Sequence, residues 1–235
     1  MALFIQLLLN SFRGNHPNQI AMYEIEETGG ARIGFGHASW PFAKLLVNKN
    51  ELRLNASILG TVCFRPSDII SIEPSSLFSG AGIKINHRLS AYSAKVIFLT
   101  SGSRDLIKRI QDTGFLNNPD PIPAEVEAEV VEYQSSGSFP MKWSAVIVFV
   151  VIWNLLFLGD RLGYFGNTGN RIPIGIGAQL ALAFAFLSAL AILVSEPFSR
   201  LVLKDGRSAR EIRSFLFFLM FITGFMFATI SLIPG

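Results

Sequence analysis

The chain has 235 residues and a formal net charge of +3; half of its residues are hydrophobic and only 16% are charged. Charged residues make up about a quarter of a typical soluble domain, so this composition excludes an ordinary water-soluble protein. No segment carries the clustered Lys and Arg side chains that nucleic-acid binding requires, which excludes nucleic acid as a partner.

Residues 1–19 form a short apolar N-terminal segment, which begins MALFIQLLLNSFRG. The segment is too short to cross a bilayer, because a membrane-spanning helix needs about 20 apolar residues. It also lacks the preceding basic residues and the small-residue cleavage site of a signal peptide. We therefore expect a short helix that lies on the membrane or against the domain that follows.

Residues 20–116 show the alternation and turn signals of a small antiparallel β-domain. Leu52 and Leu54 alternate with polar residues, and in DIISIEP the same pattern predicts that Ile70 and Ile72 point into the core. Several such strands in a row are typical of a small barrel or sandwich. Cys63 is the only cysteine, so no intramolecular disulfide is possible, and we expect it to pack as a small buried apolar side chain.

The hydrophobic period changes after the last of these strands, in SGSRDLIKRIQDTGF. Leu106, Ile107 and Ile110 form an apolar stripe with helical spacing, and Gly114 is a suitable C-terminal cap. One amphipathic helix at this point would cover the open end of a barrel. The predicted fold class is therefore α+β, with a small antiparallel β-barrel and its C-terminal capping helix followed by three transmembrane helices.

The order of the strands, the segment FRPSDIISIE and the terminal helix RDLIKRIQDTGF resemble the pleckstrin-homology-like (PH-like) domains of bacterial membrane proteins. The resemblance covers roughly residues 30–116. It implies a bent, seven-stranded barrel that is capped by one helix. Domains of this family often lie beside transmembrane helices, mostly without assigned chemistry, and eukaryotic relatives often bind phosphoinositides through a basic motif in the first hairpin.

The first hairpin of this chain offers Lys44, Lys49 and Arg53, without the tight basic-x-Arg pairing of that motif. This departure disfavours inositol-lipid binding and leaves two alternatives. The three side chains form a solvated face, or they contact a protein partner or anionic headgroups, to which each basic residue contributes about 1 kcal/mol near the membrane.

Residues 117–140 form a linker that holds five acidic residues and no basic residue. Its Glu residues alternate with apolar ones, which fits an edge strand or the start of a helix, but we predict an acidic tether. The tether would either hold the β-domain away from an anionic membrane or fold back onto a basic loop downstream. In the second case we expect Glu127 or Glu129 to face Arg207 or Arg210.

Residues 141–235 form a transmembrane domain with predicted spans at 143–158, 172–195 and 214–233. These lengths lie near or within the range of about 17–25 residues for a helix that crosses a bilayer. The spans contain no Asp, Glu, Lys, Arg or His residue, which argues against a proton-driven pump or a voltage sensor.

Basic residues in the two short loops predict the orientation of the spans. The second loop holds five basic residues and the first holds two, so the positive-inside rule places the second loop in the cytoplasm. The prediction is a multi-pass protein of the cell membrane, with a cytoplasmic N-terminal domain and an external C-terminus. The five basic residues are also candidates for contact with the membrane surface or a partner: Arg200, Lys204, Arg207, Arg210 and Arg213.

Small residues recur every four positions on the second and third spans, which is typical of closely packed membrane helices. Packing within one chain and a homo-oligomer interface are both compatible with this pattern. The residues are Gly177, Ala181, Ala185 and Ala189 on the second span, and Gly224 and Ala228 on the third.

The sequence contains no recognisable catalytic or cofactor-binding motif. His16, His37 and His87 lie far apart without ligand-spaced partners, so no metal site and no cofactor is predicted. The first hypothesis is a non-enzymatic protein whose cytoplasmic β-domain recognises a protein partner or the membrane surface. The alternative is a small transporter or channel component that acts through oligomerised helices, and an enzyme acting on lipid lacks a candidate nucleophile or acid–base pair.

Overall fold

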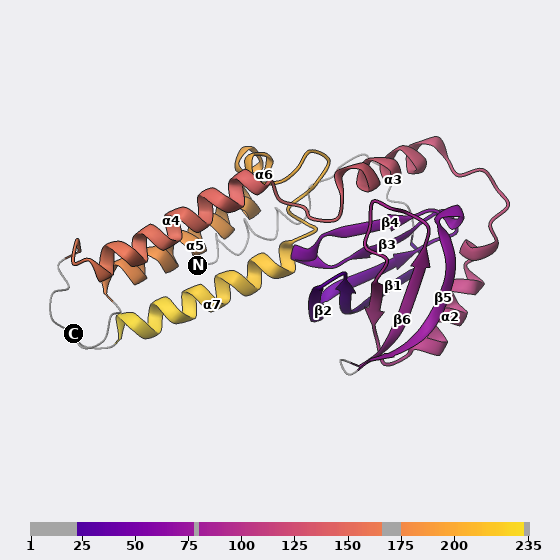
Figure 1. Cartoon of the computed structure of the whole chain (residues 1–235), viewed down its shortest axis with the longest axis horizontal. Coiled ribbons are helices and arrows are strands. Elements are labelled where there is room, and N and C mark those ends of the chain that lie inside the picture. Colours follow the sequence, from indigo (N-terminus) through magenta and orange to yellow (C-terminus); the bar gives the residue numbers. More distant parts are fainter. Residues whose placement is uncertain (1–22, 78–79, 166–174, 233–235) are drawn as a thin grey trace, which may run out of the picture.

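The computed structural model describes residues 23–77, 80–165 and 175–232, and it consists of a β-domain beside a group of long helices (Figure 1). The N-terminal apolar segment, at 1–19, lies outside the described residues.

Seven antiparallel strands form one curled sheet, in the order β4-β3-β2-β1-β7-β6-β5 (Figure 1). The two ends of this order, β4 and β5, are the edges of the sheet. The strands are β1 (Ile25–Ile33), β2 (Gly36–Val47), β3 (Leu52–Asn55), β4 (Thr61–Phe64), β5 (Ile69–Leu77), β6 (Gly80–His87) and β7 (Val96–Leu99).

The concave face of the sheet and helix α2 (Ser103–Asp112) share one apolar core. Leu52 and Leu54 of β3 are fully buried in it, as the alternation predicts. Leu106 and Ile110 of α2 join the same core, so α2 covers the sheet as a capping helix. The α+β fold class is therefore confirmed.

Strand β5 differs from the predicted pattern. The pairing of β5 with β6 shifts register between Ile69 and Ser71, and Ile70 is 64% exposed. A register irregularity of this kind places one extra residue on one strand and turns its side chain away from the sheet's regular alternation. Ile69 is buried in place of Ile70, while Ile72 packs against the core as predicted.

The acidic linker forms a helix, α3 (Ala124–Ser136), so the predicted tether is wrong. Val126, Val130 and Tyr133 recur with helical spacing, and they pack together with Cys63 of β4. This apolar face stabilises a helix on the edge strand of the sheet and leaves the Glu residues toward solvent. Cys63 is buried, as predicted.

Three helices are long and apolar enough to cross a membrane, as predicted: α4 (Trp143–Arg161), α5 (Ile176–Val194) and α7 (Arg213–Ser231). Residues 172–174 and 233 of the predicted spans lie outside the described residues. Helix α5 contacts both α4 and α7, and the short helix α6 (Glu196–Val202) follows it. Large apolar side chains stay exposed along α4 and α7, which suits a surface that faces lipid.

The small residues of α5 lie where the helices approach one another closely. A Cβ atom on Gly177 would lie 2.5 Å from the Leu156 carbonyl oxygen of α4. Ala181, Ala185 and Ala189 are buried further along α5. On α7, Gly224 lies opposite the Phe186 ring of α5, whereas Ala228 is exposed.

Candidate functional site

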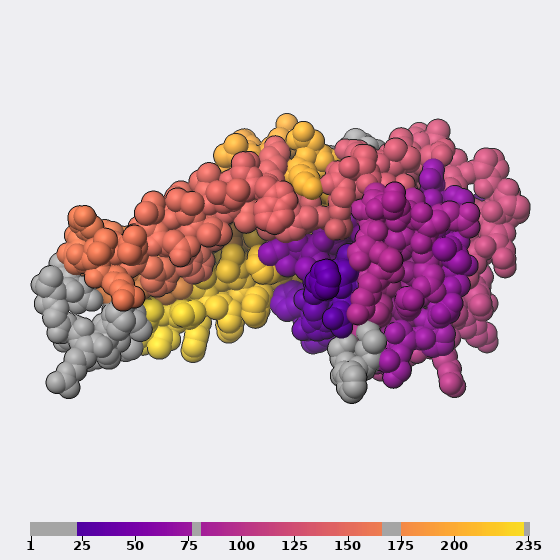
Figure 2. All heavy atoms as spheres, in the orientation of Figure 1, coloured from indigo at the N-terminus to yellow at the C-terminus, as the bar shows by residue number. Residues whose placement is uncertain are grey.

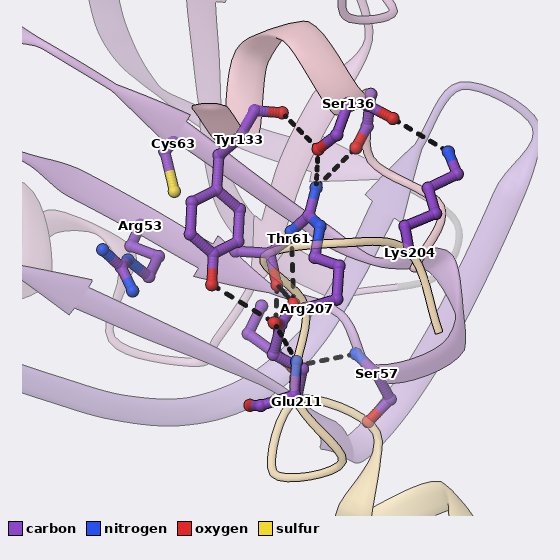
Figure 3. A network of polar contacts seen from close by, with 12 residues as sticks. Arg53, Ser57, Thr61, Cys63, Tyr133, Ser136, Lys204, Arg207 and Glu211 are labelled. Carbon is purple, nitrogen blue, oxygen red and sulfur yellow. Dashed lines mark hydrogen bonds and ion pairs between the residues drawn. The ribbon is translucent and has the colours of Figure 1, made fainter. Parts of the chain in front are cut away.

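Three distant parts of the chain meet in one group of polar side chains between the β-domain and the long apolar helices (Figure 3). Thr61 comes from edge strand β4, Tyr133 and Ser136 from the end of α3, and Arg207 and Glu211 from the loop between α6 and α7. We call these five residues the junction network.

Arg207 is the centre of the junction network, and its side chain is only 1% exposed. Its guanidinium group pairs with Glu211 Oε2 at 3.2 Å and donates to Ser136 Oγ at 3.1 Å and to the Gly137 carbonyl oxygen. It also lies over the Tyr133 ring, with the central carbon 4.1 Å from the ring centroid. These contacts use the planar, multi-donor geometry of arginine, which lysine cannot reproduce.

Glu211 is the matching acid, with a side chain that is 10% exposed. Besides Arg207, its carboxylate accepts from Thr61 Oγ1 at 2.8 Å, from Tyr133 Oη at 3.2 Å and from the Ser208 amide at 3.1 Å. Such additional hydrogen bonds offset the cost of burying the pair, although Arg207 Nε has no partner among the described residues. Burial raises the pKa of Tyr133 above its ordinary value, so its hydroxyl stays protonated and remains a donor to Glu211.

Backbone contacts reinforce the junction network. The Thr61 amide donates to the Ser138 carbonyl oxygen at 3.1 Å, and a Cβ atom on neighbouring Gly60 would overlap that oxygen. Beyond Ser138 the chain forms an antiparallel bridge between Met141 and Leu203, the residue that follows α6. The segment between α3 and α4 is therefore held by β4 on one side and by the end of α6 on the other.

A second contact joins strand β2 to helix α7. The rings of Phe42 and Phe218 meet edge-on, with centroids 5.3 Å apart. Figure 2 shows the yellow atoms of α7 meeting the purple atoms of the β-domain. Phe218 lies five residues after Arg213, the first residue of α7. The contact is therefore about 7.5 Å along the helix axis from the start of α7. Trp40 lies two residues before Phe42 and is 72% exposed.

A cavity of about 870 Å³ lies where α5, α6 and α7 meet, and we call it the loop cavity. The ends of α5 and α7 supply its apolar wall, and the loop between α6 and α7 supplies its polar wall. Two acidic residues, Glu196 and Asp205, also line it. All five basic residues predicted from this loop line the cavity: Arg200, Lys204, Arg207, Arg210 and Arg213.

The three basic residues predicted on the first hairpin lie elsewhere and do not line the loop cavity. Lys44 pairs with Glu26, and Lys49 pairs with Asp120 at 3.9 Å. The Arg53 side chain is 15% exposed and pairs with Glu51 and Glu129. It also lies over the ring of Tyr133, so α3 covers much of this side chain.

The linker does fold back toward the basic loop, but Glu127 and Glu129 are not the residues that reach it. They pair with the β-domain arginines Arg65 and Arg53, at 3.3 Å and 2.9 Å. The contact with Arg207 comes instead from Tyr133 and Ser136, which the sequence does not single out. The available signal was the helical spacing of Val126, Val130 and Tyr133, because that face predicts a helix that ends beside Ser136.

Within residues 23–77, 80–165 and 175–232, no group of three or more His, Cys, Asp or Glu side chains is arranged to hold a metal ion. Comparison of the chain with protein-family models, with curated proteins and with solved structures yields no match.

Proposed function

We propose that this chain is a non-enzymatic protein of the cell membrane whose β-domain is a PH-like module that works at the cytoplasmic membrane surface. The curled sheet with its capping helix α2 supports the PH-like assignment. The five basic residues of the second loop support a cytoplasmic position for that loop and for the β-domain joined to it.

The observation that carries this proposal is the attachment of the β-domain to the helices at two places. The junction network fixes edge strand β4, and the contact between Phe42 and Phe218 places β2 against the first turns of α7. A domain held in this way stays next to the bilayer surface. Trp40 is exposed beside this contact, and Trp is enriched at the interface between bilayer and water.

The depth of Trp40 tests the proposal. The full chain carries Trp143→Phe and Trp153→Phe, so that Trp40 is the one tryptophan that remains of the three, and it is placed in phospholipid nanodiscs. We expect lipids brominated near the headgroup to quench Trp40 fluorescence more strongly than lipids brominated deep in the acyl chain.

The matched control carries Trp40→Phe and Gly102→Trp in the same background. A Cβ atom on Gly102 meets no other atom within 4 Å. Gly102 immediately precedes α2, and α2 lies on the side of the β-domain away from the long helices (Figure 1). We expect little quenching of this variant. Equal quenching of the two tryptophans contradicts the proposal and makes a protein partner the better assignment for the β-domain.

A further inference from the structure

The loop cavity changes from apolar to basic across its walls. Ile192, Leu193 and Val194 at the end of α5, together with Phe217 of α7, form the apolar wall. If α5 and α7 cross the bilayer, their 19 residues span about 28 Å, close to the thickness of the hydrocarbon core. The cavity then lies at the level where lipid headgroups meet water.

The acidic residues of the cavity do not neutralise its basic wall. Glu196 pairs with Arg200 at 2.6 Å, and Asp205 pairs with Lys142, which lies outside the lining, at 3.6 Å. Arg207 pairs with Glu211 behind the cavity. The Glu132 carboxylate of α3 lies against Gly206 of the lining. When Glu132, Glu211 and Lys142 are counted with the lining, six basic side chains stand against four acidic ones, which leaves a positive potential at this end of the helices.

Lys204 is the clearest source of this potential. Its ammonium group donates to the neutral Ser136 carbonyl oxygen at 2.8 Å. Within the part of the chain that the structure describes, no carboxylate lies within ion-pair distance of it. A lysine ammonium group has three N–H donors, so the side chain can hold Ser136 and still donate to an anion in the cavity.

We infer that the loop cavity binds a phosphate-bearing anion, and specifically the headgroup of an anionic phospholipid. A phosphate group accepts charge-assisted hydrogen bonds from Lys and Arg side chains, which supply the polar wall. The apolar wall, with Leu193 and Phe217, accommodates the start of an acyl chain, which a soluble phosphate does not have. The cavity lining does not include Trp40, so the result of the Trp40 quenching experiment does not decide whether the cavity binds a lipid headgroup.

Binding is measured as the rise in unfolding temperature of the full chain in neutral detergent as short-chain phosphatidylglycerol is added. Short-chain phosphatidylcholine, inorganic phosphate and glycerol phosphate are added in parallel. We expect phosphatidylglycerol to bind in preference to phosphatidylcholine, and its affinity to fall as salt is added. Saturable binding of phosphate or glycerol phosphate as tight as that of the lipid supports the site and assigns it to a soluble anion.

Lys204→Gln tests the site, with Lys49→Gln as a matched control that removes the same charge outside the cavity. We expect Lys204→Gln to weaken phosphatidylglycerol binding about tenfold, the loss of one charge-assisted hydrogen bond, and Lys49→Gln to leave it unchanged. Equal effects of the two variants overturn the inference, since general surface charge would then explain the binding.

A second pair of variants removes none of the basic side chains. Ser208 is exposed and lines the cavity, so Ser208→Asp adds a negative charge there and Ser208→Asn adds a similar volume without charge. We expect only Ser208→Asp to weaken phosphatidylglycerol binding. Unchanged binding by a folded Ser208→Asp protein also overturns the inference.

Discussion

At the scale of single residues, two arginines of the second loop show how burial decides the strength of an ion pair. Arg200 and Arg207 each pair with a Glu four positions away. The side chains of Arg200 and Glu196 are 78% and 72% exposed, whereas those of Arg207 and Glu211 are 1% and 10% exposed. Exposed pairs contribute little, while breaking a buried pair leaves a charge without its partner.

We therefore expect Arg207→Met to lower the free energy of unfolding by about 3 kcal/mol or more, because Glu211 keeps its charge in a buried position. Arg200→Met is the control and should change it by less than about 1 kcal/mol. Thermal unfolding of both variants in the same detergent measures the difference. Similar stabilities for the two variants would show that the junction network does not hold the β-domain.

The sequence predicts the basic loop but not which of its arginines is buried. Positive-inside counting treats Arg200 and Arg207 alike, since it uses only their position between two spans. Burial of Arg207 depends on Tyr133, Ser136 and Thr61, which lie far away in the sequence. Arg53 is a similar case, because its position in a hairpin suggested exposure and helix α3 covers it.

At the scale of elements, prediction succeeds where one hydrophobic period dominates a segment. The alternation of β3, the stripe of α2 and the long apolar runs of α4, α5 and α7 all have one period each. In the acidic linker, Glu residues at every second position imitate a strand, while Val126, Val130 and Tyr133 follow the helical period. The segment forms a helix because its apolar face packs on Cys63 of β4.

The packing of α5 gives a prediction at this scale. Gly177 and Gly224 both belong to the small-residue pattern, but a Cβ atom on Gly177 meets a backbone oxygen at 2.5 Å, whereas one on Gly224 stays 3.5 Å from the Phe186 ring. We expect Gly177→Ala to cost about 1–3 kcal/mol of stability through overpacking against α4. Gly224→Ala should be nearly neutral in the same thermal unfolding measurement, and an equal loss in both variants would contradict this account of α5 packing.

At the scale of the whole molecule, the orientation in the membrane is the property on which the proposed function depends. A Cys63→Ala chain offers two exposed positions for a new cysteine, Gly102 before α2 and Tyr164 after α4. We expect a membrane-impermeant maleimide to label Tyr164→Cys in intact cells, and Gly102→Cys only after the membrane is opened. The reverse pattern would place the β-domain outside the cell.

The natural sequence provides the control for this experiment. Cys63 is fully buried, and burial raises the pKa of its thiol to about 12. Because the thiolate is the reactive form, the wild-type chain should stay unlabelled with the membrane intact or opened. Labelling of native Cys63 would show that α3 leaves β4 in the folded protein.

The large sequence separation within the junction network has a consequence for biosynthesis. Thr61 and Glu211 are 150 residues apart in the chain, and α4 and α5 lie between them. Domains generally fold from the N-terminus as they are synthesised, so the β-domain leaves the ribosome before Arg207 and Glu211 exist. The β-domain can therefore dock only after the ribosome has translated α4 and α5, and a nascent chain that stops before Arg207 carries a β-domain without this attachment.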